Sequence, residues 1–397
     1  MSAPTTEATP TMPAAKGPFG GLKLNPTALR AYTMVLALIA IWIFFYYKTG
    51  GVFLEARNFS NLIRATAVTG VLACGMLLII VAGHIDLSVG SLVGLCGAAA
   101  AGMMTWMGYG LLPSIATAIT VGLVVGLAHG TLVAYLNVPA FIVTLGGLLA
   151  WRGAVKGLTS GETIPIDSAG FKSLGQGYVS PTVGYIMAGI AVAIVAFFAW
   201  RNLSAAKQTA GKPSSSSLPL TAAKYGLFIL LILGFTYILN SYRGVPVPVL
   251  VLVVVAVLTA FFSQATTFGR YLYAIGGNVD AARLSGINIR RQILLVFGLM
   301  GVLTAVASLI YTARVGSASP AAGVLLELDA IAACVIGGAS LMGGRGTVMG
   351  ALLGALFMAS LDNGMSLQNV QDYLQDIIKG SVLVLAVTID MLGRKKQ

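Results

Sequence analysis

A short polar segment at residues 276–286 lies between two long apolar stretches, and its residue types suit a small capped helix. Asn278 is a preferred helix N-cap, and Asp280 falls in the first turn, where the positive end of the helix dipole favours a carboxylate. Gly286 can end the helix, and the two glycines before Asn278 predict a bend. The predicted helix and its flanks comprise Gly276, Gly277, Asn278, Asp280, Ala281, Ala282, Arg283, Leu284, Ser285 and Gly286.

A rigid knob of this kind is what a membrane protein needs in order to receive work from another subunit. An ordinary loop that contains a capped turn would show the same residues, so the pattern alone leaves both interpretations open. If the knob couples the chain to a partner, Ala282→Asp or Leu284→Asp should uncouple transport and leave the protein folded.

A second polar segment, residues 81–91, joins two very apolar stretches. Polar, glycine-interrupted backbone is tolerated there only where protein or a water-filled cavity satisfies it, and an ionisable residue in such a place indicates function. Asp86 could line a solute path with Ser88 and Ser91, or it could cap the next helix, and both roles could hold. Asp86→Asn should lower transport more than expression, whereas equal losses of both would indicate a cap.

A third segment, residues 336–350, is also glycine-rich and again interrupts an apolar stretch. It follows a helix of the same predicted orientation as the one before Gly83. The two broken segments therefore predict a weak internal repeat, which usually points to a site near the bilayer midplane. The residues predicted to lie along a substrate path are Asp86, Ser88, Ser91, Ser340 and Asn363.

No residue pattern predicts catalysis or metal binding. His84 and His129 have no partners at the spacing of metal ligands. Gly211 and Lys212 are followed by Pro213, which excludes a phosphate-binding loop. We therefore expect that the chain is not an enzyme, binds no cofactor or metal, and hydrolyses no nucleotide.

The composition explains why these polar segments are short. Of the 397 residues, 57% are hydrophobic and only 9% are charged, whereas soluble domains carry about 25% charged residues. This excludes a soluble enzyme, a disordered chain and a disulfide-stapled secreted domain. The net charge of +12 could suggest a nucleic-acid partner, but cytoplasmic loops of membrane proteins carry the same excess of Lys and Arg.

The apolar stretches predict an all-α, polytopic membrane protein, because a spanning helix needs about 20 mainly apolar residues. About twelve transmembrane helices are expected, with ten possible, and some of them are broken by glycine. The predicted spans are 31–47, 65–83, 87–107, 111–135, 140–157, 183–200, 222–240, 246–263, 291–312, 327–342, 347–362 and 373–391.

The positive charges predict that both termini lie in the cytoplasm. Residues 1–30 are expected to form a disordered cytoplasmic tail, and residues 31–397 the transmembrane domain. Within that domain, 201–221 is a predicted cytoplasmic linker and 264–290 the loop that carries the knob. Residues 158–182 are expected to form an outer platform.

Three further charged positions have simple expected roles. Lys379, in the last apolar stretch, could pair with Asp372 or Asp376 or extend toward the interface. Glu327 and Asp329 are expected to start a helix, whose positive end they suit. Asp86 is then the only plausible carboxylate in the middle of the membrane.

The chain resembles the permease subunits of bacterial sugar ABC importers, the ribose, xylose, arabinose and galactose class. Within that class it is most similar to the xylose and multiple-sugar permeases, because of residues 57–64 (RNFSNLIR) and its length. The resemblance covers about residue 30 to the C-terminus. The other matching stretches are 85–91 (IDLSVGS), 273–278 (YAIGGN), 282–288 (ARLSGIN), 327–333 (ELDAIAA), 337–344 (GGASLMGG) and 361–365 (LDNGM).

The resemblance implies a location in the bacterial inner membrane and import of a monosaccharide such as xylose. It implies that the capped helix 278–286 sits in a groove of a cytoplasmic ABC ATPase, which uses ATP and magnesium. It also implies a periplasmic sugar-binding protein on the outer loops and a permease homodimer in the lipid bilayer, without a nucleic-acid partner. An ion-driven secondary transporter, and an ABC permease for another solute such as branched-chain amino acids, are the alternatives.

Overall fold

The computed structural model describes residues 26–208 and 218–394, and helices make up most of this part of the chain. The predicted all-α class is therefore confirmed. The helices are α1 (Pro26–Lys48), α2 (Ala56–Val81), α3 (Val89–Thr105), α4 (Leu111–Ala134), α5 (Ala140–Thr159), α6 (Ala169–Gln176), α7 (Pro181–Gln208), α8 (Leu218–Asn240), α9 (Val247–Ala265), α10 (Thr267–Gly277), α11 (Val279–Leu284), α12 (Ile289–Val315), α13 (Leu326–Ile336), α14 (Val348–Leu367) and α15 (Asp372–Arg394). The other elements are the 3-10 helix η1 (Val52–Leu54) and the strands β1 (Ile164–Pro165), β2 (Tyr178–Val179), β3 (Val245–Pro246) and β4 (Ser317–Ala318).

Eight of the described helices are long and apolar enough to cross a membrane by length and composition, namely α2, α4, α5, α7, α8, α9, α12 and α14. Each of the twelve predicted spans falls on a helix. The span predicted at 327–342 is too long, because α13 ends at Ile336. The chain turns at Gly337, whose backbone packs directly against the backbone of Gly350.

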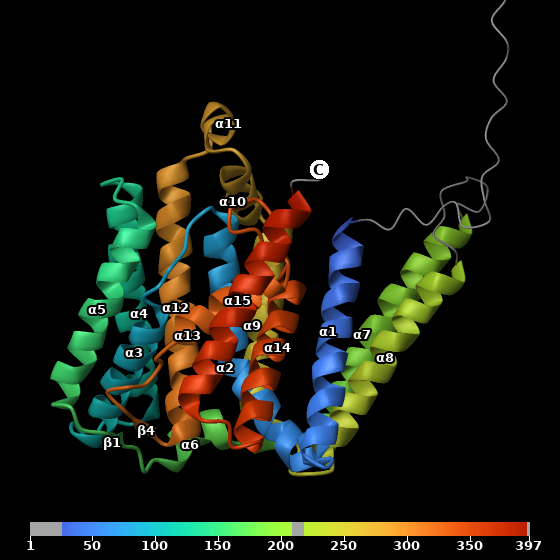
Figure 1. Cartoon of the computed structure of the whole chain (residues 1–397), viewed down its shortest axis with the longest axis horizontal. Helices are drawn as coiled ribbons and strands as arrows, with labels where there is room; N and C mark the ends of the chain where they lie inside the picture. The colour runs from blue at the N-terminus through green and yellow to red at the C-terminus, as the bar shows by residue number, and fades with distance from the viewer. Residues whose placement is uncertain (1–25, 209–217, 395–397) are drawn as a thin grey trace, which may run out of the picture.

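Two helices form the centre of the molecule and one hairpin lies at its side (Figure 1). The apolar windows of α2 and α12 are 89% and 72% buried, whereas those of α7 and α8 are only 17% and 11% buried. The α7–α8 hairpin packs mainly on itself and contributes little to the buried centre of the bundle. Helices take up both ends of the predicted linker 201–221, and its middle lies outside the described residues, as does most of the predicted tail 1–30.

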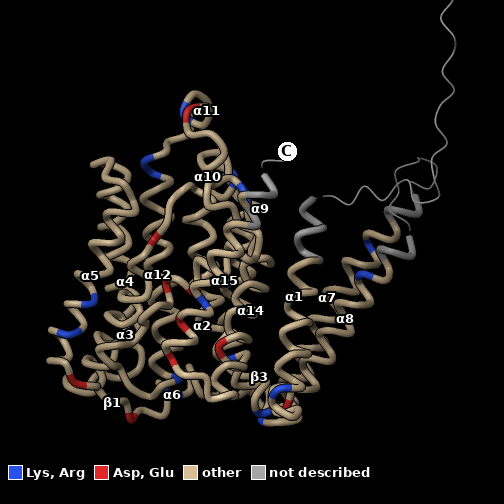
Figure 2. The backbone as a smooth tube through the Cα atoms, viewed as in Figure 1, with Lys and Arg blue, Asp and Glu red and all other residues tan. Residues whose placement is uncertain are grey.

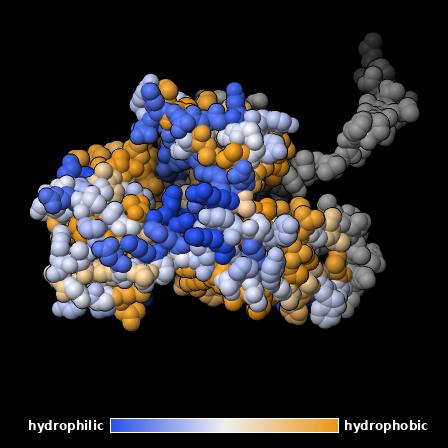
Figure 3. Space-filling model, turned by 90° about the horizontal axis from the view of Figure 1, so that it is seen from below, coloured by the Kyte–Doolittle hydropathy of each residue, from blue (hydrophilic) through white to orange (hydrophobic). Residues whose placement is uncertain are grey.

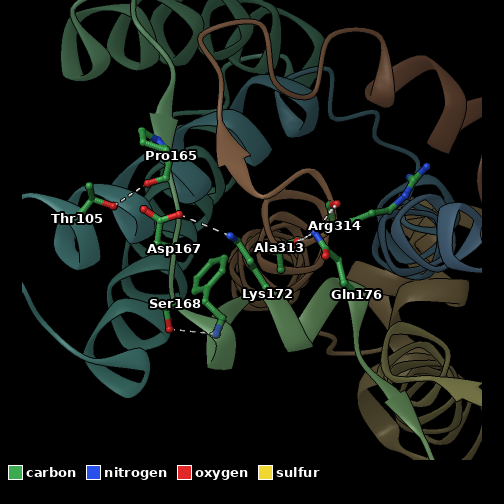
Figure 4. A network of polar contacts seen from close by, with 9 residues as sticks. Thr105, Pro165, Asp167, Ser168, Lys172, Gln176, Ala313 and Arg314 are labelled. Atoms are coloured by element: carbon green, nitrogen blue, oxygen red, sulfur yellow. Dashed lines mark hydrogen bonds and ion pairs between the residues drawn. The ribbon is translucent and has the colours of Figure 1, made fainter.

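A small platform closes one end of the bundle, at the position expected for residues 158–182. Strand β1 pairs antiparallel with β4, and β2 pairs with β3. The Thr105 hydroxyl donates to the Pro165 carbonyl at 2.9 Å, and the Gln176 side chain of α6 donates to the carbonyls of Ala313 and Arg314, each at 3.1 Å (Figure 4). These bonds hold the platform on the last turns of α3 and α12.

The two ends of the bundle differ in charge. We call them the α11 end and the platform end. Figure 2 shows Lys and Arg on α11, together with the one acid Asp280 of that helix, and near the adjoining ends of α10 and α12. At the platform end acidic residues are mixed with basic ones. The exposed arginines of the α11 end are Arg270, Arg283, Arg290, Arg291 and Arg345, and the exposed acids of the platform end include Glu55, Glu162, Asp167, Asp372 and Asp376.

Candidate coupling and transport sites

Helix α11 projects from one end of the molecule, and local residues fix both of its ends (Figure 1). Asn278 Oδ1 accepts a hydrogen bond from the Ala281 amide at 2.9 Å, as its N-cap role predicts. Gly286 follows the helix at a φ of 80°, which glycine adopts most easily. The predicted bend is one residue too early: α10 contains both glycines, and the chain turns at the extended Asn278.

The predicted coupling residues lie together on this tip, but their exposure differs sharply. The Leu284 side chain is 89% exposed and faces outward, whereas Ala282 is 3% exposed. The exposed pair of Asp280 and Arg283, 3.7 Å apart, contributes little to stability. Ala282→Asp is therefore unsuitable as a test that leaves the protein folded, because it would bury a carboxylate. Leu284→Asp remains suitable.

Beneath α11, three backbone segments meet at one junction. A Cβ atom at Gly276 would collide with the Val81 carbonyl oxygen, so only glycine allows α10 to approach the end of α2 this closely. The Gly344 amide donates to the same Val81 oxygen at 2.9 Å. The Tyr273 hydroxyl of α10 donates to the Gly346 carbonyl at 2.7 Å, and burial raises the pKa of this phenol. Helix α10 is therefore in direct contact with both the end of α2 and the turn after α13.

The polar segment before α3 is closed by hydrogen bonds. Asp86 Oδ1 accepts from the Ser88 amide at 2.9 Å and from the Ser88 hydroxyl at 2.6 Å, and the Ser91 hydroxyl donates to the Ser88 carbonyl at 2.8 Å. Ser88 Oγ lies 3.4 Å from His129 Nδ1, and Trp151 Nε1 donates to His129 Nε2 at 3.1 Å. Since Nε2 accepts, the proton of the neutral ring is on Nδ1 and points to Ser88.

The residues predicted for the substrate path lie in three separate places. Asp86 is 3% exposed and bonds the amide of Ser88, which is the N-cap residue of α3 and makes no side-chain cap bond, so the predicted capping by Asp86 itself is not seen. Ser88 and Ser91 are fully buried. Ser340 lies in the turn at the junction, where its amide donates to the Arg345 carbonyl at 2.9 Å. Asn363 lies on α14 and lines a cavity. That these residues contact a substrate stays a prediction.

The internal repeat is present, but its second half is not the segment predicted from the sequence. The first half consists of α2, the extended segment 82–88 and the short helix α3. The second half consists of α12, segment 316–325 and the short helix α13, and it runs in the opposite direction (Figure 1). The two short helices touch at their starts, because a Cβ at Gly90 would collide with the carbonyl of Gly323 and the carboxylate of Glu327. The predicted partner 336–350 is instead the turn at the junction.

A polar cavity of about 280 Å³ lies between α2, α12, α13 and α14. Asn363 and Asn58 form a reciprocal amide pair at 2.8 and 3.0 Å, which holds α14 beside α2. Viewed from the platform end, hydrophilic residues form a band across the middle of the molecule between hydrophobic margins (Figure 3). The polar residues that line the cavity are Asn61, Thr69, Tyr311, Arg314, Asp329, Asp362, Asn363 and Ser366.

Lys379 joins two acids of this cavity. Its ammonium lies 3.3 Å from Asp329 of α13 and 2.9 Å from Asp362 of α14, so α15 is fastened to both helices. The predicted partners on its own helix were wrong, because the true ones lie far away in sequence. Asp86 is also not the only buried carboxylate, since Glu327 and Asp329 are 7% and 5% exposed. Both acids do lie in the first turn of a helix, as predicted.

Metal and thiol groups contribute no further site. Within residues 26–208 and 218–394, no group of three or more His, Cys, Asp or Glu side chains could hold a metal ion. Cys74, Cys96 and Cys334 are free and buried, and the Cys334 thiol donates to the Ala73 carbonyl at 3.3 Å. The cysteines therefore serve as packing residues.

The sequence of the chain is similar to a family of transport permeases. The family described as "Branched-chain amino acid transport system / permease component" matches residues 58–387. The chain is 50% identical to the xylose transport system permease protein of Haemophilus influenzae over 94% of this chain and 99% of the relative. It is 46% identical to the Escherichia coli protein of the same name, over 96% of each. The ribose import permease protein of Escherichia coli is 35% identical over 87% of this chain and 88% of the relative. No solved structure matches the chain.

Proposed function

Because the chain belongs to the branched-chain amino acid transport system / permease component family, we propose that it is the membrane-spanning subunit of an ATP-driven importer of a monosaccharide. The names of the nearly full-length relatives favour xylose or a related pentose or hexose. The description of the family keeps branched-chain amino acids as the alternative cargo. Relatives at 50% and 46% identity that are named for xylose make the sugar the stronger candidate.

Helix α11 is the proposed contact with a separate cytoplasmic ATPase, which would bind ATP and magnesium. The observation that carries this role is the junction of Gly276, Val81 and Gly344, because it links an exposed helix to both glycine-broken segments. Closure of the ATPase would move α11, and the junction would pass that displacement to α2 and to the turn between α13 and α14. A partner can shift the equilibrium only as far as it fits one state better than the other.

The α11 end is proposed to face the cytoplasm. Its exposed arginines agree with the positive-inside rule, and α1 begins and α15 ends at the same end of the molecule (Figure 1). With this orientation, both termini are proposed to lie in the cytoplasm. The same orientation is compatible with twelve membrane crossings. In two of them a short helix, α3 or α13, crosses together with the extended segment that precedes it.

The platform end then faces the periplasm. We assign it the docking surface for a sugar-binding protein, since its short strands and α6 are held on α12 by Gln176 and present an ordered surface. A permease homodimer in the inner membrane is the proposed assembly, as in the family that the sequence resembles.

The variant Leu284→Asp tests the coupling role. It places a charge on the most exposed apolar side chain of α11, so we expect loss of ATPase co-purification and sugar uptake near background, with unchanged thermal stability. Leu112→Asp is the matched control, since Leu112 is 77% exposed in the first turn of α4. Wild-type uptake by the Leu284 variant would contradict the role of α11.

An ion-driven secondary transporter is the second candidate, and one observation favours it. Four carboxylates are buried or partly buried in the bundle, and a proton-coupled carrier needs such groups. They are Asp86, Glu327, Asp329 and Asp362. Uptake that depends on the proton gradient and not on the ATPase would identify this alternative.

A further inference from the structure

We propose that the cavity between α2, α12, α13 and α14 at the platform end is a binding site for one monosaccharide on its way through the bilayer. The inference rests on the proposed function, since it assumes that the cargo is a sugar and that the platform end faces the periplasm. The inference adds a location for the sugar within the permease, with named lining helices and named hydrogen-bonding groups.

Each wall of the cavity is one face of a helix. On α2 the lining residues are Asn61, Ala65, Val68 and Thr69, and on α14 they are Ala359, Asp362, Asn363 and Ser366. Spacings of three, four, seven and eight residues place side chains on one side of a helix. Asn61 and Ser366 are exposed at the mouth, whereas Thr69 and Asp329 are buried at the far end. The eight residues from Asn61 to Thr69 give a depth of about 12 Å.

The lining offers the groups that a sugar needs. Arg314 supplies hydrogen-bond donors, and the carboxylates of Asp329 and Asp362 supply acceptors, so ring hydroxyls can bond in both directions. The half-buried ring of Tyr311 offers an apolar face with a polar tip. Val68 adds apolar surface for the C–H groups of the ring. A ligand with both hydroxyl and C–H faces fits this mixture better than an ion or a lipid tail.

Lys379 acts as a positioning residue for this site. Its ion pairs with Asp329 and Asp362 keep both acids in place when no sugar is present. Buried acids without a cation would be costly, because an unpaired charge loses its hydration. Sugar hydroxyls can then bond to the carboxylate oxygens that Lys379 leaves free.

Two other candidate regions fit a sugar less well. The larger cavity at the α11 end, about 630 Å³, is lined mainly by apolar residues and lies under the coupling helix. The Asp86 network is buried and already bonded to His129 and Trp151. The cavity of about 280 Å³ is near the lower end of ligand pockets, about 300 Å³. That size suits a monosaccharide and excludes an oligosaccharide.

Protection of a cysteine tests occupancy without the ATPase. The three native cysteines are buried, so Ser366→Cys at the cavity mouth should be the site that a membrane-impermeant thiol reagent labels. We expect saturating xylose to slow this labelling about tenfold, equivalent to about 1.4 kcal/mol, and mannitol to have no effect. The control Ser173→Cys, exposed on α6, should react equally with and without xylose. Equal labelling of the Ser366 variant in both conditions would overturn the site.

Transport by the whole importer provides the second test. In vesicles that hold the permease, its ATPase and the binding protein, Asp362→Asn should lower the ratio of xylose transported to ATP hydrolysed about tenfold. Asp372→Asn, at an exposed acid that does not line the cavity, is the control and should match wild type. Wild-type transport by the Asp362 variant would refute the site alone. No ATP-dependent uptake by the wild-type chain would refute the proposed function, and the site with it.

Discussion

The two short helices α3 and α13 begin in the same way and differ in what surrounds their starts. Each follows an extended segment, and the starts touch where Gly90 meets Gly323. The acid before α3, Asp86, is bonded to Ser88 within a closed network. Asp329 of α13 reaches Lys379 and lines a cavity.

The same backbone arrangement, an extended segment followed by a short helix, therefore has two different roles in this molecule. A buried polar network in which every member has a partner rigidifies the structure around it. Around α13 the polar groups are not all enclosed by protein, because Asp329 pairs with Lys379 and lines the cavity. We infer that the α3 side is the fixed part of the bundle and that the α13 side meets the cargo.

The contact between the two helix starts should give the largest effect. Gly90→Leu would force a side chain into the Gly323 carbonyl and the Glu327 carboxylate, so we expect almost no folded protein in the membrane. The matched control is Gly189→Leu on α7, where a Cβ meets nothing within 4 Å. Membrane accumulation and gel filtration in detergent measure the result. Equal accumulation of the two variants would show that the helices are not in contact.

Loss of Lys379 should have the second-largest effect on the protein. Lys379→Met leaves the buried Asp329 and the partly buried Asp362 without this cation. Removing one partner of a buried pair costs about 3–5 kcal/mol, and Asp362 contributes the smaller share because water reaches it. We expect a large fall in thermal stability, partly recovered in the double variant with Asp329→Asn. A stability equal to that of wild type would mean that α15 is not held by these ion pairs.

Asp86→Asn should have a smaller and purely structural effect. The variant keeps an acceptor oxygen and weakens two hydrogen bonds, from about 1.5–3 kcal/mol each for a charged acceptor to about 0.5–1.5 kcal/mol each for a neutral one, a total loss of about 2 kcal/mol. Expression and thermal stability should fall together with transport, so that transport per folded molecule is unchanged. A fall in transport at wild-type stability would place Asp86 on the substrate path and remove the distinction between the two helix starts.

Tyr273→Phe should have the smallest effect. It removes one hydrogen bond, from the phenol to the Gly346 carbonyl, which is worth about 1 kcal/mol. We expect a slightly lower thermal stability and a modest loss of sugar transported per ATP, because the junction under α11 loosens. An unchanged ratio of sugar to ATP would show that this bond does not help to transmit the motion.

The sequence predicts the features that depend on near neighbours. The start of α11 was predictable because Asn278 bonds to an amide three residues away, and the apolar spans were predictable from length. The partners of Lys379 were not, since Asp329 is 50 residues away and only the packing of α13 against α15 brings them together. For the same reason, the acids of α13 suggested only a helix start, and the cavity that they line could not be foreseen.

The most direct test of the account is uptake of radiolabelled xylose into vesicles that contain the chain and the binding protein, with and without the partner ATPase. We predict uptake only when the ATPase and ATP are both present, and no effect of collapsing the proton gradient. Uptake that persists without the ATPase and stops when the proton gradient is collapsed would contradict the account, since α11 would then have nothing to couple.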